Sequence, residues 1–372
     1  MQTLRLFLLG GLCSFYLSSY AEETKFHIRD FQIPQSEETS TLQEKARRRM
    51  LVFEGIAQDL PWSGKAINDA AIIFQHTNTE NEPDDGESYR SQEIHLLTFF
   101  LLIEQRRLIN EPMTALLGPY RYCRAMGLPK ELDVDWVEDP MTKHQVIAPN
   151  TISDYERMKR GFPFPLLAVY QRKNENQLLL ENRTTKRDTE IAQLYLADQQ
   201  TRSLFKKDEM IFNRYIERVG DAQRRARLYE MIAEDVLWDA KTLHEAALLL
   251  DNTASIVRKK AKLIYQLQEN HLLAFFLARQ AYLKGKIDAA STIVTSFNNY
   301  VKASQMPTSF QIELISSNPV TICKTLPPVS VEQWGKYEFP FAIGRVIKPL
   351  CERNTNLEEL PSSTKQTLGS KP

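Results

Sequence analysis

An internal duplication constrains the fold of this chain more than any other feature. Residues 48–77 align without a gap with residues 224–253, at an offset of 176 (224 minus 48). The offset persists where His95 to Leu101 repeats as His271 to Leu277. A unit of this length is the size of a whole domain, whereas solenoid repeats span only about 20–50 residues. The duplication therefore predicts two tandem copies of one domain.

The repeat and the composition around it give a linear plan for the chain. Residues 22–172 are expected to form the first helical copy, and residues 191–352 the second. Residues 173–190 are mostly polar and contain no proline or glycine, so they are expected to join the copies and lead into the next helix. The polar residues 353–372 are predicted to be a disordered tail, and residues 1–21 a signal peptide.

Apolar residues recur with helical periodicity in both copies, which predicts an all-α fold. The segments 130–150 and 308–328 contain prolines and are expected to be irregular. Gly285 is expected to end a helix, and Ser153 to cap the start of another. The predicted helices are Leu42–Ala57, Lys65–His76, Ser91–Leu108, Met113–Met126, Ser153–Arg160, Thr189–Phe205, Asp221–Asp235, Lys241–Leu250, Ser255–Lys284, Asp288–Ala303 and Ser330–Tyr337.

Identical residues at equivalent positions of the two copies are mostly apolar or small. Trp62 and Trp238 share one register and are expected to anchor the packing. His95 and His271 precede apolar runs and are expected to be buried core histidines. The shared charges are expected to form ion pairs or a buried network that specifies packing. They are Arg48, Arg49, Glu54, Asp59 and Lys65, with Arg224, Arg225, Glu230, Asp235 and Lys241.

The first 21 residues have the organisation of a signal peptide. Arg5 supplies the positive charge, Leu6–Leu17 the apolar region, and Ser19-Tyr20-Ala21 a small-x-small cleavage site. The apolar run is shorter than the ~20 residues of a comfortable membrane span. We therefore expect an exported protein that begins at Glu22, without a membrane span after cleavage, in the periplasm or secreted; the alternative is an uncleaved anchor.

Charge and motifs exclude several classes of function. The 47 basic and 47 acidic residues cancel, which argues against a nucleic-acid partner. The chain contains only 13 glycines and no phosphate-binding loop, Gly-x-Ser-x-Gly, His-Glu-x-x-His or Cys-x-x-Cys motif. The acidic loop Asn78–Glu87 lacks the spacing of a calcium loop. We therefore predict no cofactor and no metal.

Three cysteines follow the predicted cleavage site. Export would permit disulfides. Cys323 and Cys351 flank a proline-containing C-terminal segment and are a possible disulfide. Cys123 has no cysteine counterpart in the second copy, so it is either a thiol or the partner of one of the others.

Several short motifs occur in both copies or are divided between them. Asp198-Gln199-Gln200-Thr201-Arg202 opens the second copy, and Gln75-His76 closes a helix of the first. Asp154-Tyr155-Glu156-Arg157, followed by Gly161-Phe162-Pro163, ends the first copy. In these motifs the chain resembles an uncharacterised family of bacterial helical domains of unknown function. The resemblance implies a helical fold with a shared polar signature.

The chain departs from the family pattern where polar residues are expected. The second copy has Asp251-Asn252 in place of Gln75-His76, and Glu22–Phe26 does not match the Asp-Gln-x-x-Arg motif. Neither copy has the Gly-Thr-Gln of the family. Catalytic groups must be held in one site to work. Any active site is therefore expected to survive in at most one copy.

Two functional hypotheses follow. The first is an exported module that binds an unknown protein or small molecule through grooves between helices, with Asp198, Gln199 and Arg202 as candidate ligand-binding residues. The alternative is a hydrolase-type enzyme with one site in the first copy, around His76, Gln75 and Asp59. His76 could act there as a general base or metal ligand, or could cap helix carbonyls.

Overall fold

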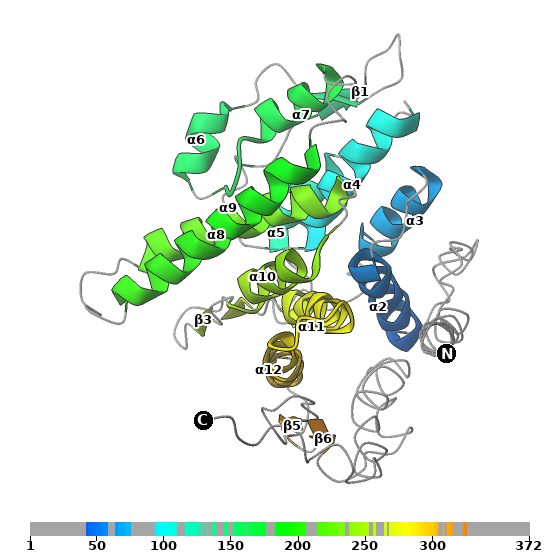
Figure 1. The fold of residues 1–372 in the computed structure, drawn as a ribbon. Coiled ribbons are helices and arrows are strands. Elements are labelled where there is room, and N and C mark those ends of the chain that lie inside the picture. The colour runs from blue at the N-terminus through cyan, green and yellow to red at the C-terminus, as the bar shows by residue number, and fades with distance from the viewer. Residues whose placement is uncertain are drawn as a thin grey trace, which may run out of the picture.

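The structure is a computed structural model in which the all-α class is confirmed (Figure 1). The part that it describes comprises residues 42–58, 64–75, 94–109, 116–125, 128, 132, 136–138, 145–147, 152–160, 162–175, 183–205, 214–234, 238–252, 256–257, 264–265, 268–303, 308, 311–314 and 323–325. The first copy contains α2 (Leu42–Gln58), α3 (Gly64–Gln75), α4 (Ile94–Ile109), α5 (Leu117–Ala125), β1 (Trp136–Glu138), β2 (Gln145–Ile147), α6 (Asp154–Lys159) and α7 (Leu166–Glu175). The second contains α8 (Arg183–Phe205), α9 (Arg214–Ala233), α10 (Ala240–Asp251), β3 (Ile256–Val257), β4 (Ile264–Tyr265), α11 (Gln268–Leu283), α12 (Ala289–Ala303), β5 (Ile312–Leu314) and β6 (Cys323–Thr325).

Strands correct two of the sequence predictions. The expected single helix Ser255–Lys284 is wrong, because β3 and β4 pair antiparallel before α11 begins. Ile256 and Val257 are β-branched and lie opposite Tyr265 and Ile264, residue types that favour a paired strand over a helix. The segments expected to be irregular contain the short antiparallel pairs β1–β2 and β5–β6.

Two local predictions are confirmed. The hydroxyl of Ser153 accepts a hydrogen bond from the Glu156 backbone N–H and caps α6. Gly285 has φ 99°, and it ends α11. The N–H of Lys286 donates to the Ala281 carbonyl at 2.9 Å, and the N–H of Gly285 donates to the Tyr282 carbonyl at 3.0 Å. This is a Schellman motif, in which glycine takes the left-handed position without a Cβ penalty.

The order of the helices repeats between the two copies. α3 and α10 are separated by an offset of 176 at both ends. α4 and α11 carry His95 and His271 at the same offset. The offset grows to 178 in α5 and α12, where Tyr122 corresponds to Tyr300. Positions on these three pairs of helices can therefore be compared one by one.

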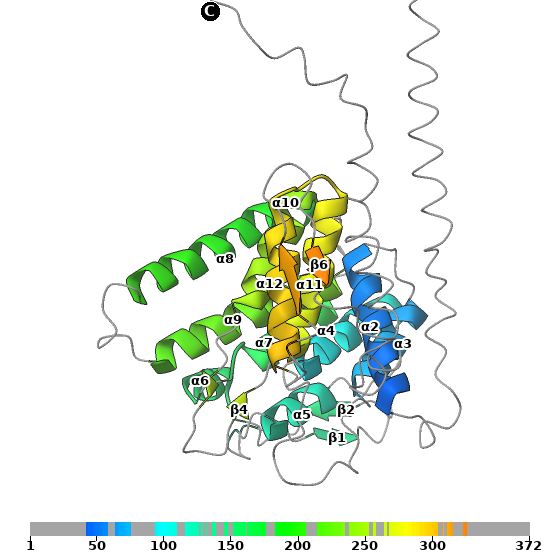
Figure 2. The same cartoon turned by 90° about the horizontal axis from the view of Figure 1, so that it is seen from below.

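The two copies are interleaved through their first equivalent helices. α2 of the first copy packs against α11 of the second, and α9 of the second packs against α4 of the first. Both ribbon views show α2 beside α11 (Figures 1 and 2). Within the described residues, α2 does not pack as closely on α4 of its own copy, and α9 does not pack as closely on α11 of its own copy. The exchange is reciprocal, so the helices of one copy complete the core of the other.

Ion pairs accompany the contact between α2 and α11. Arg49 Nε lies 2.6 Å from Glu269 Oε1, and Arg279 Nη1 lies 3.6 Å from Glu54 Oε1. Burial raises the pKa of Glu54 above its usual value, and the Arg279 charge opposes that shift. Of the shared charges expected to form ion pairs, Lys65 pairs with Asp69 within α3, and Asp59 lies outside the described residues.

Apolar and small side chains fill the core as their repetition predicts. Trp238, His95 and His271 are buried, and Ala70-Ala71 and Ala246-Ala247 are fully buried. Phe99, Phe100, Phe162 and Phe164 form an aromatic cluster in the first copy, with ring centroids 5.0–5.6 Å apart. A Cβ on Gly118 would lie only 2.7 Å from the His95 carbonyl oxygen. Close approach of α5 to α4 therefore requires glycine at this position.

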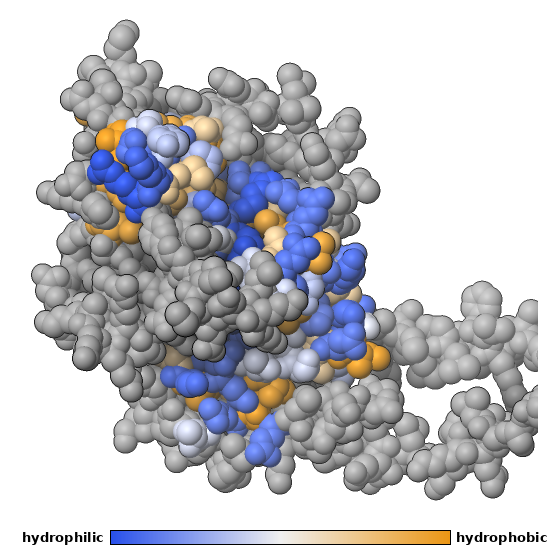
Figure 3. Space-filling model, turned by 90° about the vertical axis from the view of Figure 1, so that its left-hand side faces the viewer, coloured by the Kyte–Doolittle hydropathy of each residue, from blue (hydrophilic) through white to orange (hydrophobic). Residues whose placement is uncertain are grey.

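The long helices α8 and α9 lie side by side and extend beyond the rest of the described chain (Figure 2). The described surface on the face in Figure 3 is mostly hydrophilic, with apolar side chains scattered among polar ones. Leu196 of α8 is one of the exposed apolar residues. Within the described residues, no helix is both long and apolar enough to cross a bilayer.

Candidate functional site

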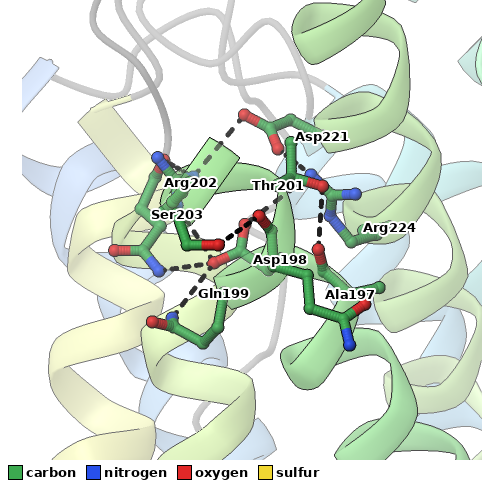
Figure 4. Close-up of polar contacts among 10 residues, drawn as sticks. Ala197, Asp198, Gln199, Thr201, Arg202, Ser203, Asp221 and Arg224 are labelled. Atoms are coloured by element: carbon green, nitrogen blue, oxygen red, sulfur yellow. Dashed lines mark hydrogen bonds and ion pairs between the residues drawn. The ribbon is translucent and has the colours of Figure 1, made fainter. Parts of the chain in front are cut away.

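The Asp198-Gln199-x-x-Arg202 motif lies near the C-terminal end of α8, and its two charges face each other across one helical turn (Figure 4). Arg202 Nε donates to Asp198 Oδ2 at 3.0 Å. Asn252, which follows the last residue of α10, donates its side-chain amide to the same oxygen at 2.7 Å. The Asp198 side chain is only 2% exposed. The Gln199 amide is 3.4 Å from Asp198 Oδ2, and Gln199 itself is exposed.

Two residues of α9 complete this group. Arg224 pairs with Asp221 and lies 3.6 Å from Asp198 Oδ1. Arg202 Nη2 lies 3.6 Å from Asp221 Oδ2 and also donates to the backbone carbonyl of Asn252. We call Asp198, Arg202, Asp221, Arg224 and Asn252 the aspartate–arginine network.

The aspartate–arginine network is closed on itself. Two carboxylates face two guanidinium groups, and all four carboxylate oxygens have a cationic partner within 3.6 Å. Paired and hydrogen-bonded charges of this kind offset their cost of burial, whereas an unpaired buried charge would not. The network therefore joins α8, α9 and α10, and each of its carboxylate oxygens faces an arginine.

A second polar group of the second copy lies at the end of α10. His271 Nδ1 of α11 is 2.8 Å from Asp251 Oδ1. Asn299 of α12 donates its amide to both Asp251 oxygens, at 3.2 and 3.3 Å. We call Asp251, His271 and Asn299 the copy-two cluster. Its carboxylate is satisfied entirely by side chains of the same chain.

The equivalent positions of the first copy are Gln75, His95 and Arg121, which we call the copy-one cluster. Arg121 of α5 donates to the backbone carbonyl of Gln75, the last residue of α3. The Arg121 charge also lies close enough to His95 of α4 to affect its titration. Burial, together with that charge, lowers the pKa of His95 to about 3, so the imidazole is neutral near pH 7. The three residues thus meet at the end of α3.

The copy-one cluster differs from the copy-two cluster in its acceptors. Gln75 replaces Asp251, so an amide stands where the second copy has a carboxylate. Gln75 is 4% exposed, and its Nε2 has no hydrogen-bond acceptor within the described part of the chain. A buried N–H donor without an acceptor costs about 1–3 kcal/mol. The copy-one cluster therefore retains a donor that nothing described here satisfies.

The Asp154-Tyr155-Glu156-Arg157 motif has structural roles. The Asp154 carboxylate accepts hydrogen bonds from the backbone N–H groups of Leu167 and Ala168, both at 2.8 Å, at the start of α7. Arg157 is fully buried and donates to the carbonyls of Leu132 and Ile152. The motif thus fixes the turn from α6 to α7 and anchors the preceding loop.

The structure brings together only some of the residues that the sequence singled out. Asp198, Gln199 and Arg202 meet, and Arg121 contacts the backbone of Gln75 and acts on His95 through its charge. The candidates His76 and Asp59 lie outside the described residues, as does Cys351, the predicted partner of Cys323. His244, which has Asn68 as its counterpart, bonds Thr292 Oγ1 at 2.8 Å and links α10 to α12.

Sequence reasoning missed the partners that come from other helices. Asp221, Asn299 and Arg121 carry no motif, and Asn252 was noted only as the counterpart of His76. Asp221 and Arg224 are three residues apart on one helix, a spacing that favours an ion pair. The sequence therefore indicates this pair, but it does not indicate that α8 packs beside the pair.

Among the described residues, no group of three or more His, Cys, Asp or Glu side chains is placed to hold a metal ion. No protein-family model, no curated protein and no solved structure matches the chain. The resemblance to the helical family of unknown function therefore stays a prediction.

Proposed function

We propose that this chain is an exported binding protein whose ligand site lies in the first copy, at the copy-one cluster, while the second copy serves as scaffold. Export rests on the signal-peptide pattern of residues 1–21. The two tandem copies keep one helical plan, and their polar groups have diverged at equivalent positions. The alternative, a hydrolase around His76 and Asp59, depends on residues outside the described part of the chain.

The observation that carries the proposal is the buried amide of Gln75. Buried polar groups in folded proteins are nearly always hydrogen-bonded, and each exception calls for an explanation. At the equivalent position of the second copy, Asp251 is bonded by both His271 and Asn299. An acceptor on a bound molecule would satisfy Gln75 in the same way.

The aspartate–arginine network supports the division of roles. Its charges balance and its carboxylates are all engaged, so its geometry suits holding three helices together. The candidate ligand-binding residues Asp198 and Arg202 are therefore assigned to the scaffold. The copy-one cluster, where the buried amide of Gln75 lacks an acceptor among the described residues, is the site that we assign to a ligand.

A thermal-unfolding screen with small molecules tests the proposal. A ligand that binds only the folded state raises the free energy of unfolding by mass action, by about 2.7 kcal/mol at a ligand concentration of 100 Kd. The melting temperature rises as a result. We expect at least one compound to stabilise the mature protein and to lose its effect on Gln75→Leu. The matched control is Asp251→Asn, which alters the copy-two cluster and should leave the ligand-induced shift intact. Failure of every compound to stabilise the protein would contradict the proposal.

A further inference from the structure

We infer that the ligand of the copy-one cluster is a carboxylate, which accepts a hydrogen bond from the Gln75 amide and pairs with the Arg121 guanidinium. The inference rests on the proposed function, because it names the chemistry of the same site. Its basis is a comparison of two polar groups that one chain builds on equivalent helices.

The equivalence of the two groups follows from helix register. Gln75 and Asp251 are the last residues of α3 and α10 and are separated by 176. His95 and His271 have the same separation on α4 and α11. Arg121 and Asn299 are separated by 178, the offset shown by Tyr122 and Tyr300 on α5 and α12. Each also donates to the residue that ends the neighbouring helix, Arg121 to the backbone carbonyl of Gln75 and Asn299 to the carboxylate of Asp251.

The substitutions between the copies replace an acceptor of the second copy by hydrogen-bond donors in the first. In the second copy, an aspartate accepts hydrogen bonds from an amide and pairs with an imidazole nitrogen. In the first, the aspartate is replaced by a glutamine and the asparagine by an arginine. The internal carboxylate is lost, while a donor amide and a guanidinium are gained. A carboxylate from outside has two oxygens that can accept several hydrogen bonds, and guanidinium groups bind it with high specificity.

The position at the end of α3 raises one electrostatic objection. Helix C-termini carry partial negative charge and disfavour anions. In the first copy, Arg121 donates to the terminal carbonyl of Gln75 and offsets that charge. In the second copy, Asp251 occupies the same end, while Arg202 binds the next carbonyl, that of Asn252. Both copies therefore place an arginine on these carbonyls, and the second already holds a carboxylate there.

Arg121 also supplies a route of approach. Gln75 and His95 are buried, whereas Arg121 is partly exposed on α5. A carboxylate can meet the guanidinium first and then reach the amide of Gln75. The neutral His95 adds no charge repulsion to a ligand and can donate or accept, depending on its tautomer.

The test compares the binding of carboxylates with that of the corresponding neutral amides, on the mature full-length protein. Acetate and benzoate are titrated against acetamide and benzamide, with chloride and sulfate at matched ionic strength, by calorimetry and thermal unfolding. We expect at least one carboxylate to bind, and its amide to bind at least tenfold more weakly. Binding of neutral compounds alone, lost in Gln75→Leu, would overturn this inference and leave the proposed function standing. Binding of nothing would overturn both.

A second variant, which carries its own carboxylate at this position, distinguishes loss of binding from loss of folding. Gln75→Asp gives the first copy the residue of the second. We expect it to melt at a higher temperature than Gln75→Leu without ligand and to bind the carboxylate at least tenfold more weakly than the parent protein. Asp251→Asn is the control and should bind like the parent. Carboxylate binding that persists unchanged in Gln75→Asp would overturn the inference.

Discussion

Arg49 Nε of α2 lies 2.6 Å from Glu269 Oε1 of α11, which joins the first copy of the repeat to the second. Their side chains are 14% and 9% exposed, so the pair is largely shielded from water. A shielded pair costs little while both partners are present and much when one is removed. The pair therefore reports directly on whether α2 lies on the helix of the other copy.

Charge reversal tests this contact. Arg49→Glu would place two carboxylates against each other and should lower the free energy of unfolding by about 3–5 kcal/mol. The double variant Arg49→Glu with Glu269→Arg should recover at least half of that loss, as measured by urea unfolding. Lys286→Ala is the control, because Lys286 pairs with the exposed Asp288 and such pairs contribute about 0–1 kcal/mol. No recovery in the double variant would show that the two residues do not meet.

Two glycine-to-alanine substitutions should change the stability of the protein in opposite directions. Gly118→Ala places a methyl group 2.7 Å from the His95 carbonyl and 3.0 Å from Phe99 Cβ, so α5 must move away from α4. Overpacking of this kind costs about 1–3 kcal/mol. Gly220→Ala in α9 meets only the Arg224 side chain, at 3.5 Å, and should gain about 0.5–1 kcal/mol from helix propensity. Equal effects of the two changes on the melting temperature would contradict the close approach of α4 and α5.

The aspartate–arginine network should behave as a structural unit. Asp198→Asn keeps the shape of the side chain but leaves Arg202 and Arg224 facing a neutral group, and should cost about 3 kcal/mol of stability. Gln199→Ala, at the exposed neighbour in the same motif, should change stability by less than about 0.5 kcal/mol. Chemical unfolding measures both. A larger effect of Gln199→Ala than of Asp198→Asn would argue that the motif serves binding instead.

His95 should make the protein sensitive to mild acid. Its folded-state pKa of about 3 lies below the usual histidine pKa of 6.5, because burial and the Arg121 charge disfavour the imidazolium. The unfolded chain therefore takes up the proton first, and stability present above pH 6.5 is lost progressively as the pH falls toward 3. The loss is about 1.4 kcal/mol per pH unit, or roughly 2 kcal/mol by pH 5. Urea unfolding of His95→Gln at pH 7, 6 and 5 should show a shallower decline than the parent, and parallel declines would refute the assignment.

The helices could be predicted from the sequence because their apolar periodicity is local. The Ser153 cap and the Gly285 turn were equally local, and both are found. Ser255–Lys284 failed because apolar β-branched residues at 256, 257 and 264 fit a strand as well as a buried helix. The reciprocal packing of α2 and α9 had no sequence signal. The apolar face of α2 can be buried equally well on α4 or on α11, since these helices repeat each other.

The candidate site shows the same division. Asp198 and Arg202 pair within one helix, so their four-residue spacing was informative. Gln75 was identified beside His76, but its meeting with Arg121 joins residues 46 apart in the sequence. The functional contrast between Gln75 and Asp251 was visible as a substitution between copies. Its meaning depends on which donors surround each residue, and that is a property of the fold.

Hydrogen exchange measured by mass spectrometry tests most directly whether the two copies are interleaved. Gly118→Ala changes a residue of the first copy only, at the contact between α5 and α4. Because α9 packs on α4 and α2 on α11, the loss of stability should reach both copies. We predict that α9 and α11 lose as much protection, in free energy of opening, as α4. Full protection of α9 and α11 in a variant whose α4 has become less protected would show that the copies fold separately, and would contradict the account.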